Sequence, residues 1–322
     1  MISNTLQHKN PQANFLKLIN HQEETITTNP TEIKNSIENY YSNLYKPNSL
    51  QPLPPTWKKT YQPIPSIKHE FYKDLLIEIT TNEILQTISQ STNNKAPGPS
   101  QISFDIIKKI TNPETLNFLK ILFNNIIKEG KIPNQWKQQS IYPISKKLEW
   151  RYNIQETRPI ALLDTFRKIF TKILTNRLSK IFLSHKILQG HNFAGLPNQG
   201  TFQPIQILNS IYNTAKLNKD ELWILSLDIK AAFDSVSNET ISNSMNRLKI
   251  PQQFTNLIID ILTDRKCSII TSHGPTNNIA ISKGIPQGET ISPLLWTIFY
   301  DPLLTKLNES KKHIISLTTL PI

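Results

Sequence analysis

The stretch Leu227-Asp228-Ile229-Lys230-Ala231-Ala232-Phe233-Asp234 decides how the rest of the sequence is interpreted. It completes an apolar, alternating run from Trp223 to Ile229, and this pattern predicts a β-strand. Asp228 would end that strand, and a carboxylate at the end of a buried strand is costly unless something compensates its charge. A divalent metal ion is the usual partner. From these residues alone, a metal ligand and a cap of the following turn are both open interpretations of Asp228.

Downstream of this stretch, the sequence predicts two amphipathic helices, a hairpin and a last apolar helix. Residues 267–271 and 278–282 would pair as the hairpin, across His273-Gly274-Pro275. A loop from Gly284 to Gly288 leads into the apolar helix, which would begin near Pro293. The two amphipathic helices are separated by Pro251, and their apolar positions are Ile241, Met245 and Leu248, then Phe254, Leu257, Ile258, Ile261 and Leu262.

Upstream, helical spacing recurs in three places. The first helix covers residues 33–44, the second follows Thr81, and the third covers residues 116–127. Gly130 and Pro133 supply the usual stop signals for the third helix.

The segments between these helices predict irregular structure and one strand. Residues 1–30 are polar and predicted to be poorly ordered, and residues 47–66 are rich in proline, which is typical of an extended linker. Residues 93–100 contain two prolines and a glycine and must form a loop. Residues 138–145 predict a strand, with Lys146 at its end.

A long apolar stripe begins at Leu162 and continues to Ile181, with basic residues interleaved. One interpretation is a core helix whose basic face is solvated. The other is that the basic face lies beside a nucleic-acid backbone. The pattern does not separate the two, and the basic residues are Arg167, Lys168, Lys172, Arg177 and Lys180.

Composition favours a polyanionic partner. The chain has 322 residues, with 36 Lys and Arg against 24 Asp and Glu, a net charge of +12 and a pI near 9.5. Cys267 is the single cysteine, which excludes an intramolecular disulfide and fits a reducing compartment. No signal peptide, no apolar run of about 20 residues and no zinc-ligand spacing occur. We therefore expect an intracellular protein without a membrane partner, nuclear if it is functional.

Five blocks in order resemble those of a known family. Asp228, with Phe233 five residues later and Asp234 next, resembles motif A of reverse transcriptases. The series as a whole is similar to the non-LTR (LINE-type) retrotransposon class and covers roughly residues 80 to 305. The other blocks are Asn94–Pro99, Arg158–Leu163 with Lys168 and Leu174–Leu178, Asn192–Leu196 through Thr201, and the motif B block of Gly284–Glu289, Ser292–Leu295 and Phe299–Leu304.

The resemblance implies roles for particular residues. Asp228, with the carbonyl of Ile229, matches the motif A ligands of two Mg²⁺ ions, which activate the primer 3′ hydroxyl and stabilise the leaving pyrophosphate. It therefore implies Asp228 as the catalytic residue, deoxynucleoside triphosphates as substrates, and an RNA template and DNA primer as partners. Asp234 is interpreted as a cap of the next helix rather than a metal ligand, and Asp301 as structural.

The resemblance implies a set of nucleotide-binding residues: Lys146, Arg158, Ile229, Phe233, Gln287 and Gly288. Phe233 matches a steric gate against the ribose 2′ hydroxyl, although a core aromatic is the alternative. Lys146 and Arg158 match cations on the triphosphate, for which the guanidinium fork is well suited. Gln287 and Gly288 match a turn that approaches the template–primer pair, where glycine is needed because it has no Cβ.

Departures from the family pattern suggest a degenerate or truncated copy. The aromatic-x-Asp-Asp hairpin that follows motif B in the family does not occur before Ile322, and one carboxylate should hold a Mg²⁺ pair poorly. Ser100-Gln101 and Asn198–Thr201 also differ from the usual residues. We expect a truncated reverse transcriptase region that is inactive by itself. The alternatives are a polymerase module completed by another chain and a non-catalytic nucleic-acid-binding protein derived from a reverse transcriptase.

The fold class expected is α+β, a right-hand polymerase fold with fingers and an incomplete palm and with the thumb absent. We predict an N-terminal extension with one helix and a linker over residues 1–66, fingers over 67–200 and a partial palm over 201–322. The palm sheet would combine the motif A strand with the downstream hairpin. Exposed apolar surface and an open strand edge predict poor solubility. The sequence does not specify an oligomeric state.

Overall fold

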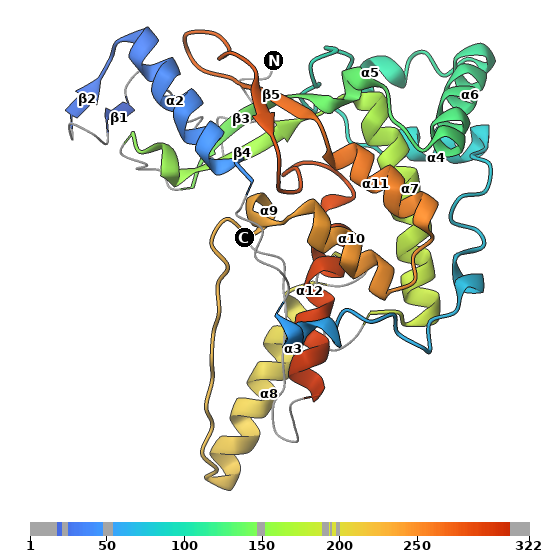
Figure 1. Ribbon diagram of the computed structural model, residues 1–322, viewed down its shortest axis with the longest axis vertical. Helices are drawn as coiled ribbons and strands as arrows, with labels where there is room; N and C mark the ends of the chain where they lie inside the picture. The colour runs from blue at the N-terminus through green and yellow to red at the C-terminus, as the bar shows by residue number, and fades with distance from the viewer. Residues whose placement is uncertain are drawn as a thin grey trace.

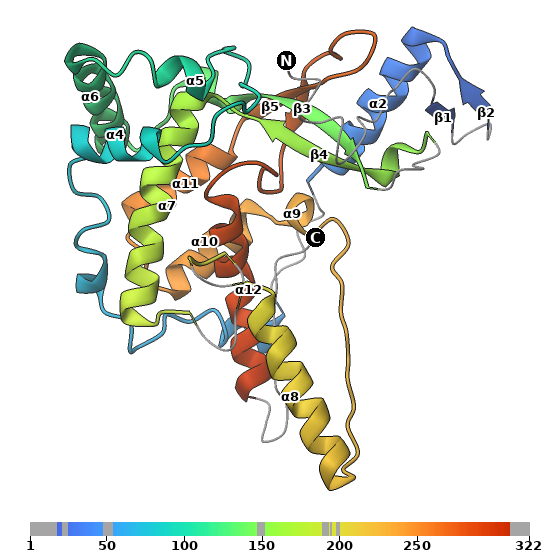
Figure 2. The ribbon, with the colours of Figure 1, turned by 180° about the vertical axis from the view of Figure 1, so that it is seen from behind.

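A computed structural model describes residues 18–20, 25–47, 54–146, 152–188, 193, 195–197 and 200–309. The fold is of mixed α and β type, which confirms the expected α+β class. Figures 1 and 2 show a small sheet that lies between helix α2 (Pro30–Leu44) at one side and the helices around α7 (Thr165–His185) at the other. The predicted domain divisions near residues 66 and 200 stay predictions.

The sheet has four strands in the order β4–β3–β5–β6. β3 (Gln138–Ser145) pairs antiparallel with β4 (Thr157–Leu162) and parallel with β5 (Arg265–Ile269). β5 pairs antiparallel with β6 (Ile279–Ile281), which confirms the predicted hairpin. A separate two-stranded sheet contains β1 (Leu18–Asn20) and β2 (Thr25–Thr27).

The remaining elements are helices, and most of those predicted are present. The third predicted helix is α6 (Pro113–Glu129), and Gly130 ends it at φ 66° as its stop signal requires. The helix after Thr81 is α4, which begins with a capping box between Thr80 and Glu83. The helices beyond α2, α6 and α7 are α3 (Pro55–Lys58), α4 (Thr81–Ser89), α5 (Phe104–Ile107), α8 (Phe202–Asn218), α9 (Ala232–Ser235), α10 (Asn238–Arg247), α11 (Gln252–Leu262) and α12 (Ser292–Glu309), with 3₁₀ turns at His69–Tyr72, Asn134–Lys137 and Ile154–Glu156.

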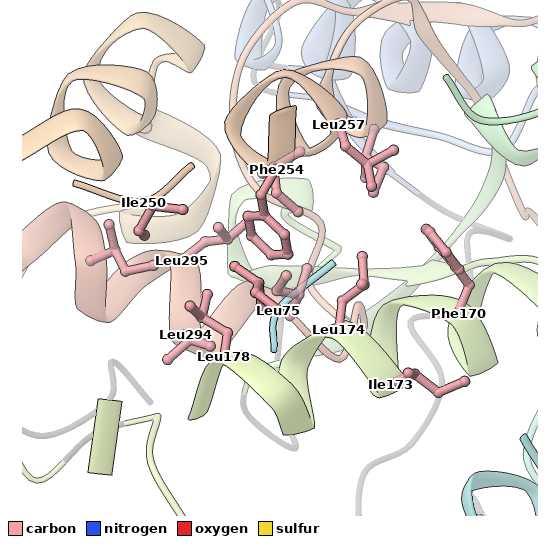
Figure 3. Packing of buried hydrophobic residues seen from close by; sticks show 14 of the residues in the cluster. Leu75, Phe170, Ile173, Leu174, Leu178, Ile250, Phe254, Leu257, Leu294 and Leu295 are labelled. Atoms are coloured by element: carbon pink, nitrogen blue, oxygen red, sulfur yellow. The ribbon is translucent and has the colours of Figure 1, made fainter. Parts of the chain in front are cut away.

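The hydrophobic core is divided into two clusters. The larger surrounds α7, where Phe170, Leu174 and Leu178 pack against residues of α11 and α12 (Figure 3). The smaller lies between α2 and one face of the sheet. Its members are Ile33, Ile37, Tyr41, Tyr45, Ile141, Ile154, Ala161, Leu163, Cys267, Ile269, Ile279 and Ile281.

The basic stripe of α7 is not a single solvated face. Arg167 is fully buried and pairs with Glu289, and Arg177 pairs with Glu83. Among the five basic residues, Lys180 is exposed, while Lys168 and Lys172 are half-buried. The core helix is confirmed, but Arg167 is neither solvated nor free to contact nucleic acid, and contact of the lysines with nucleic acid stays a prediction.

The strand predicted from Trp223 to Ile229 is wrong. Residues 220–229 adopt no regular secondary structure, and Trp223 is 86% exposed. A strand needs partners for its backbone groups, and the outer strands β4 and β6 each bond to a non-strand residue near their ends. The Ala161 N–H at β4 donates to Gln287 O, and the Ser282 N–H beyond β6 donates to Tyr45 O. The hairpin joins β3 rather than residues 223–236, here called the motif A segment, which corrects the predicted palm sheet.

Helix α8 and the segment after it project away from the rest of the molecule in both ribbon views (Figures 1 and 2). The sequence analysis did not predict this helix. Its apolar side chains are largely exposed, and Leu217 reaches 82%. Apolar surface is therefore exposed on α8 and on the segment after it, while the expected poor solubility stays a prediction.

Some predicted features lie outside the described residues. These are residues 1–17, part of the proline-rich linker, the end of the chain beyond residue 309, and Asn192, Ala194, Asn198 and Gln199 of the connecting block. Among the described helices, none combines the length and the apolar character needed to cross a membrane.

Candidate functional site

The candidate site forms where a turn from residues 284–289, here called the motif B turn, meets strand β4 and helix α9. The Ala161 N–H donates to Gln287 O at 2.6 Å. Gly288 has φ 120°, and a Cβ at this position would lie 2.7 Å from Ala161 O. A side chain would therefore push the turn off β4. The close approach that Gly288 permits in this structure is to the sheet, while its approach to a template–primer pair stays a prediction.

The same turn is held against the motif A segment by backbone hydrogen bonds. The Gly284 N–H donates to Val236 O at 2.7 Å, and the Ile285 N–H donates to Phe233 O at 2.9 Å. Gly284 has φ 86°, and a Cβ there would lie 3.0 Å from the Asp234 Cα. Motif A and motif B, which are about 50 residues apart in sequence, thus share one small interface.

Asp234 is buried at that interface and accepts a hydrogen bond from Gln287 Nε2 at its Oδ2, at 3.0 Å. Burial raises the pKa of this carboxyl to about 6, against the opposing effects of the Gln287 hydrogen bond, Arg265, Lys146 and Lys283. The predicted capping role is wrong, because Asp234 lies inside α9 and Ser237 caps α10. The sequence could not show that Ser237 rather than Asp234 caps α10, because both residues are polar and lie shortly before that helix.

Asp228 and Ile229 lie in the extended segment that leads to α9. Asp228 is exposed, Ile229 is partly exposed, and neither makes a side-chain hydrogen bond or an ion pair within the described residues. Ala231 follows with the left-handed value φ 49°. Asp228 is therefore accessible, as a catalytic carboxylate must be, but the strand that was expected to hold it is absent from this structure.

The residues described do not fit a metal-ion pair. Mg²⁺ requires near-octahedral oxygen ligation. Within the described ranges, no three His, Cys, Asp or Glu side chains come together in a way that could hold a metal ion. Asp234, the nearest other carboxylate in sequence, is engaged with Gln287 and buried. Asp228 with the Ile229 carbonyl is thus an incomplete ligand set.

Lys146 and Arg158 lie at the same end of the β3–β4 hairpin. Ile144 pairs with Arg158, and the Lys146 N–H donates to Glu156 O at 2.8 Å, so the register continues to Lys146. Lys146 Nζ donates to Gln155 O at 2.8 Å. The burial alternation of β4 puts Arg158 on the face opposite Pro159 and Ala161, where it is half-buried. Both cations therefore lie near one another at one end of the sheet.

Phe233 belongs to the packing of the larger core. Its ring centroid lies 5.7 Å from that of Trp296 in α12, with the two planes tilted by 52°. The side chain is partly buried, and its backbone oxygen holds Ile285. The structure thus supports the alternative interpretation of a core aromatic, and the steric gate stays a prediction.

A second buried network, which the sequence analysis missed, anchors the far end of the motif B turn. Arg167 Nε donates to Glu289 Oε2 at 2.6 Å, and Thr171 Oγ1 donates to Glu289 Oε1 at 2.6 Å. The signal was present in the sequence, because Arg167 shares a helix face with Phe170 and Leu174 at spacings of three and seven. Asp301 is likewise buried and pairs with Arg247, which confirms its structural role.

Comparison with known proteins identifies the class to which this arrangement belongs. The family model described as reverse transcriptase (RNA-dependent DNA polymerase) matches residues 144–317, which is more than half of the chain. The matched range includes β4, the motif A segment, the hairpin and the motif B turn. The chain belongs to this family, whose polymerases generally use divalent metal ions.

Curated relatives are polymerases of mobile elements. The chain is 25% identical over 221 residues to a probable RNA-directed DNA polymerase from transposon BS of Drosophila melanogaster, covering 69% of this chain and 24% of that protein. It is 26% identical over 231 residues to the RNA-directed DNA polymerase from mobile element jockey of the same species, covering 71% and 25%. It is 25% identical over 238 residues to the Pol polyprotein from the type-1 retrotransposable element R2 of Nasonia vitripennis, covering 74% and 22%.

These relatives confirm the resemblance to non-LTR retrotransposon reverse transcriptases. The chain spans about a quarter of the length of the curated relatives that it matches. The substrates, partners and activity of those longer proteins therefore remain to be argued for this chain.

Proposed function

We propose that this chain is part of a non-LTR retrotransposon RNA-directed DNA polymerase and forms the fingers and the front of the palm of a right-hand fold. Its role is to bind the incoming deoxynucleoside triphosphate beside a paired RNA template and DNA primer. The observation that carries the proposal is the junction of β4, α9 and the motif B turn, where Gln287 contacts both Ala161 and Asp234.

The cations of the hairpin supply the triphosphate contacts in this proposal. Arg158 lies on the half-buried face of β4, three residues from Ala161, whose N–H donates to the motif B turn. Lys146 continues the strand paired with it. A guanidinium fork binds phosphate oxygens in two places, and the lysine adds a compact charge. The triphosphate and the motif B turn would thus meet along one strand.

The metal ion of the proposal is Mg²⁺, for which Asp228 and the Ile229 carbonyl are the ligands contributed by this chain. Within the described residues, Asp228 belongs to no group of three or more side chains that could hold a metal ion. Additional ligands would have to come from outside the described residues or from another chain. We therefore propose that the 322-residue chain alone does not catalyse nucleotidyl transfer.

Nucleotide binding can be tested separately from catalysis. Equilibrium binding of a fluorescent deoxynucleoside triphosphate to the chain should weaken at least fivefold in Arg158→Ala and less in Lys146→Ala. Lys180→Ala removes an exposed cation from α7 and serves as the matched control, with binding unchanged. Equal affinities for wild type and Arg158→Ala, or equal losses in all three variants, would remove the triphosphate role.

A second candidate function is nucleic-acid binding without catalysis. It is favoured by the net charge of +12 together with the exposed, incomplete ligand set at Asp228. Binding of a single-stranded RNA should then weaken steeply with salt. The same affinity in Asp228→Ala, with no affinity for the triphosphate, would support this candidate over the polymerase role.

A further inference from the structure

A buried polar cluster lies behind the motif B turn, and the function proposed above does not use it. Its members, here called the Asp234 cluster, are Asp234, Gln287, Arg265 and Gln139. Asp234, Arg265 and Gln139 are buried, and Gln287 is half-buried. They come from α9, the motif B turn, β5 and β3, so the cluster joins both family motifs to the sheet.

Gln287 is held by both its side chain and its backbone. Its Nε2 donates to Asp234 Oδ2 at 3.0 Å, and its carbonyl oxygen accepts from the Ala161 N–H at 2.6 Å. Gly288 has no side chain, so these two contacts hold the middle of the turn, while the Gly284, Ile285 and Glu289 contacts hold its two ends. Loss of the Asp234 contact would leave the backbone bond as the main polar link between Gln287 and the sheet.

The cluster encloses a small space. A cavity of about 10 Å³ is lined by all four members together with Tyr45 and Pro159, among others. This is close to the smallest volume that admits one water molecule. Gln139 Oε1 is buried and has no hydrogen-bond partner among the described residues. A water molecule in the cavity could donate a hydrogen bond to that oxygen and so complete the cluster.

Packing alone does not explain a carboxyl group at this position. Burial opposes its ionised form, as the raised pKa of about 6 shows, and apolar residues of similar volume are usually at least as stable in such places. Arg265 in turn is committed to the Leu262, Lys283 and Gly284 carbonyl oxygens. The contact that requires an acceptor at residue 234 is the one with Gln287.

We propose that Asp234 is a positioning residue, which sets Gln287 and the following Gly288 against strand β4 and thereby fixes the motif B turn. Asp234 acts through Gln287 and itself contacts no substrate. The consequence for nucleotide binding rests on the proposed function, whereas the contact and its effect on the turn do not.

Hydrogen exchange at individual amides tests the positioning role. Asp234→Ala should speed exchange of the Ala161 amide at least tenfold, because Gln287 O would no longer be held. Asp234→Asn retains an acceptor oxygen and should restore most of the protection. Asp260→Ala is the matched control, since Asp260 accepts from the Ile132 N–H at 2.8 Å. It should release the Ile132 amide and leave Ala161 unchanged.

The outcomes separate this proposal from the proposed function. Unchanged Ala161 exchange in Asp234→Ala, or equal acceleration in Asp234→Asn, would overturn the positioning role. Should Asp234→Ala not fold, Gln287→Leu removes the donor instead and should release the same amide. Triphosphate binding is then measured on the same variants. If Ala161 is released but the wild-type chain binds no triphosphate, the positioning role stands and the nucleotide-binding function fails.

Discussion

At the scale of single residues, the charged groups with the largest consequences in this chain are the buried ones. Asp234, Arg265, Arg167 and Glu289 are all buried, and each has contacts with a segment remote in sequence. Burying a charge is unfavourable unless it is compensated, so these residues make stability sensitive to pH and to the loss of a partner.

Asp234 should make the free energy of unfolding depend on pH. Its pKa of about 6 in the folded chain exceeds the ordinary value of 3.8. Between these values the folded chain holds a proton that the unfolded chain has released, so stability falls as pH rises from about 4 to about 6. The loss from this group is on the order of 3 kcal/mol, at 1.36 kcal/mol for each pKa unit. The polar and titratable groups that interact with Asp234 are Gln287, Arg265, Lys146 and Lys283, together with Tyr40, Tyr41 and Tyr45 at α2.

Urea unfolding at pH 4, 5, 6 and 7 measures this contribution. Asp234→Asn cannot ionise, so it should lack this part of the decline and gain stability relative to wild type as pH rises. Curves for the two proteins that stay parallel across the range would contradict the assignment.

The buried Arg167–Glu289 pair should respond differently to single and double replacement. Arg167→Met leaves the Glu289 carboxylate unpaired in the core and should cost about 3–5 kcal/mol. The double variant Arg167→Met with Glu289→Leu removes both charges and should recover most of that loss. Chemical denaturation gives the comparison, and a double variant as unstable as the single one would show that packing, not charge, dominates here.

At the scale of elements, the strands that were predicted correctly are those that find a pairing strand and an apolar face to cover. β3 and the β5–β6 hairpin could be predicted from their alternating apolar residues, because one face of each strand packs against α2. The run from Trp223 to Ile229 has an equally clear strand pattern but no partner strand among the described residues, and a pattern cannot supply one. Ile205, Leu208 and Tyr212 recur at helical spacing, so α8 was predictable from the sequence although it was not predicted.

In the candidate site, the residues within each sequence motif could be predicted, but their contacts with distant segments could not. The motif residues Gln287 and Gly288 were found, but their contacts with Asp234 and β4 depend on how distant segments fold together. Arg265 gave no signal at all, because nothing near it in sequence indicates that its guanidinium binds the Gly284 carbonyl oxygen.

The exposed apolar surface of α8 and the motif A segment should drive self-association. Leu217, Trp223 and Leu225 are more than 80% exposed, and an unpaired extended segment invites pairing with another chain. Replacing all three by lysine should shift the sedimentation profile from aggregates towards monomer.

A matched variant controls for added charge. Gln206→Lys with Asn209→Lys and Asn213→Lys, at exposed polar positions of α8, adds the same three charges and should leave association nearly as in wild type. If this charge-only variant disperses the aggregates equally well, electrostatic repulsion rather than apolar surface is the cause.

At the scale of the whole molecule, a well-connected junction contrasts with an exposed segment. β4, α9 and the motif B turn are joined by hydrogen bonds, whereas Asp228 stands on an exposed segment and belongs to no group of three potential metal ligands among the described residues. Under the proposed function, the phosphate contacts and the metal contacts therefore fall on different segments and can be tested separately. Binding of a triphosphate does not imply catalysis.

Primer extension tests this division. On an RNA template with a DNA primer and Mg²⁺, the 322-residue chain should add no detectable nucleotide, because one carboxylate and one carbonyl leave most of the octahedral sites of the ion to water. The relatives are about three times as long as this chain, so a protein of that length that contains this chain is the positive control. In that protein Asp228→Asn should abolish extension while triphosphate binding through Arg158 persists. Extension by the 322-residue chain itself would mean that the motif A segment rearranges on binding substrate and gathers ligands that the free chain keeps apart.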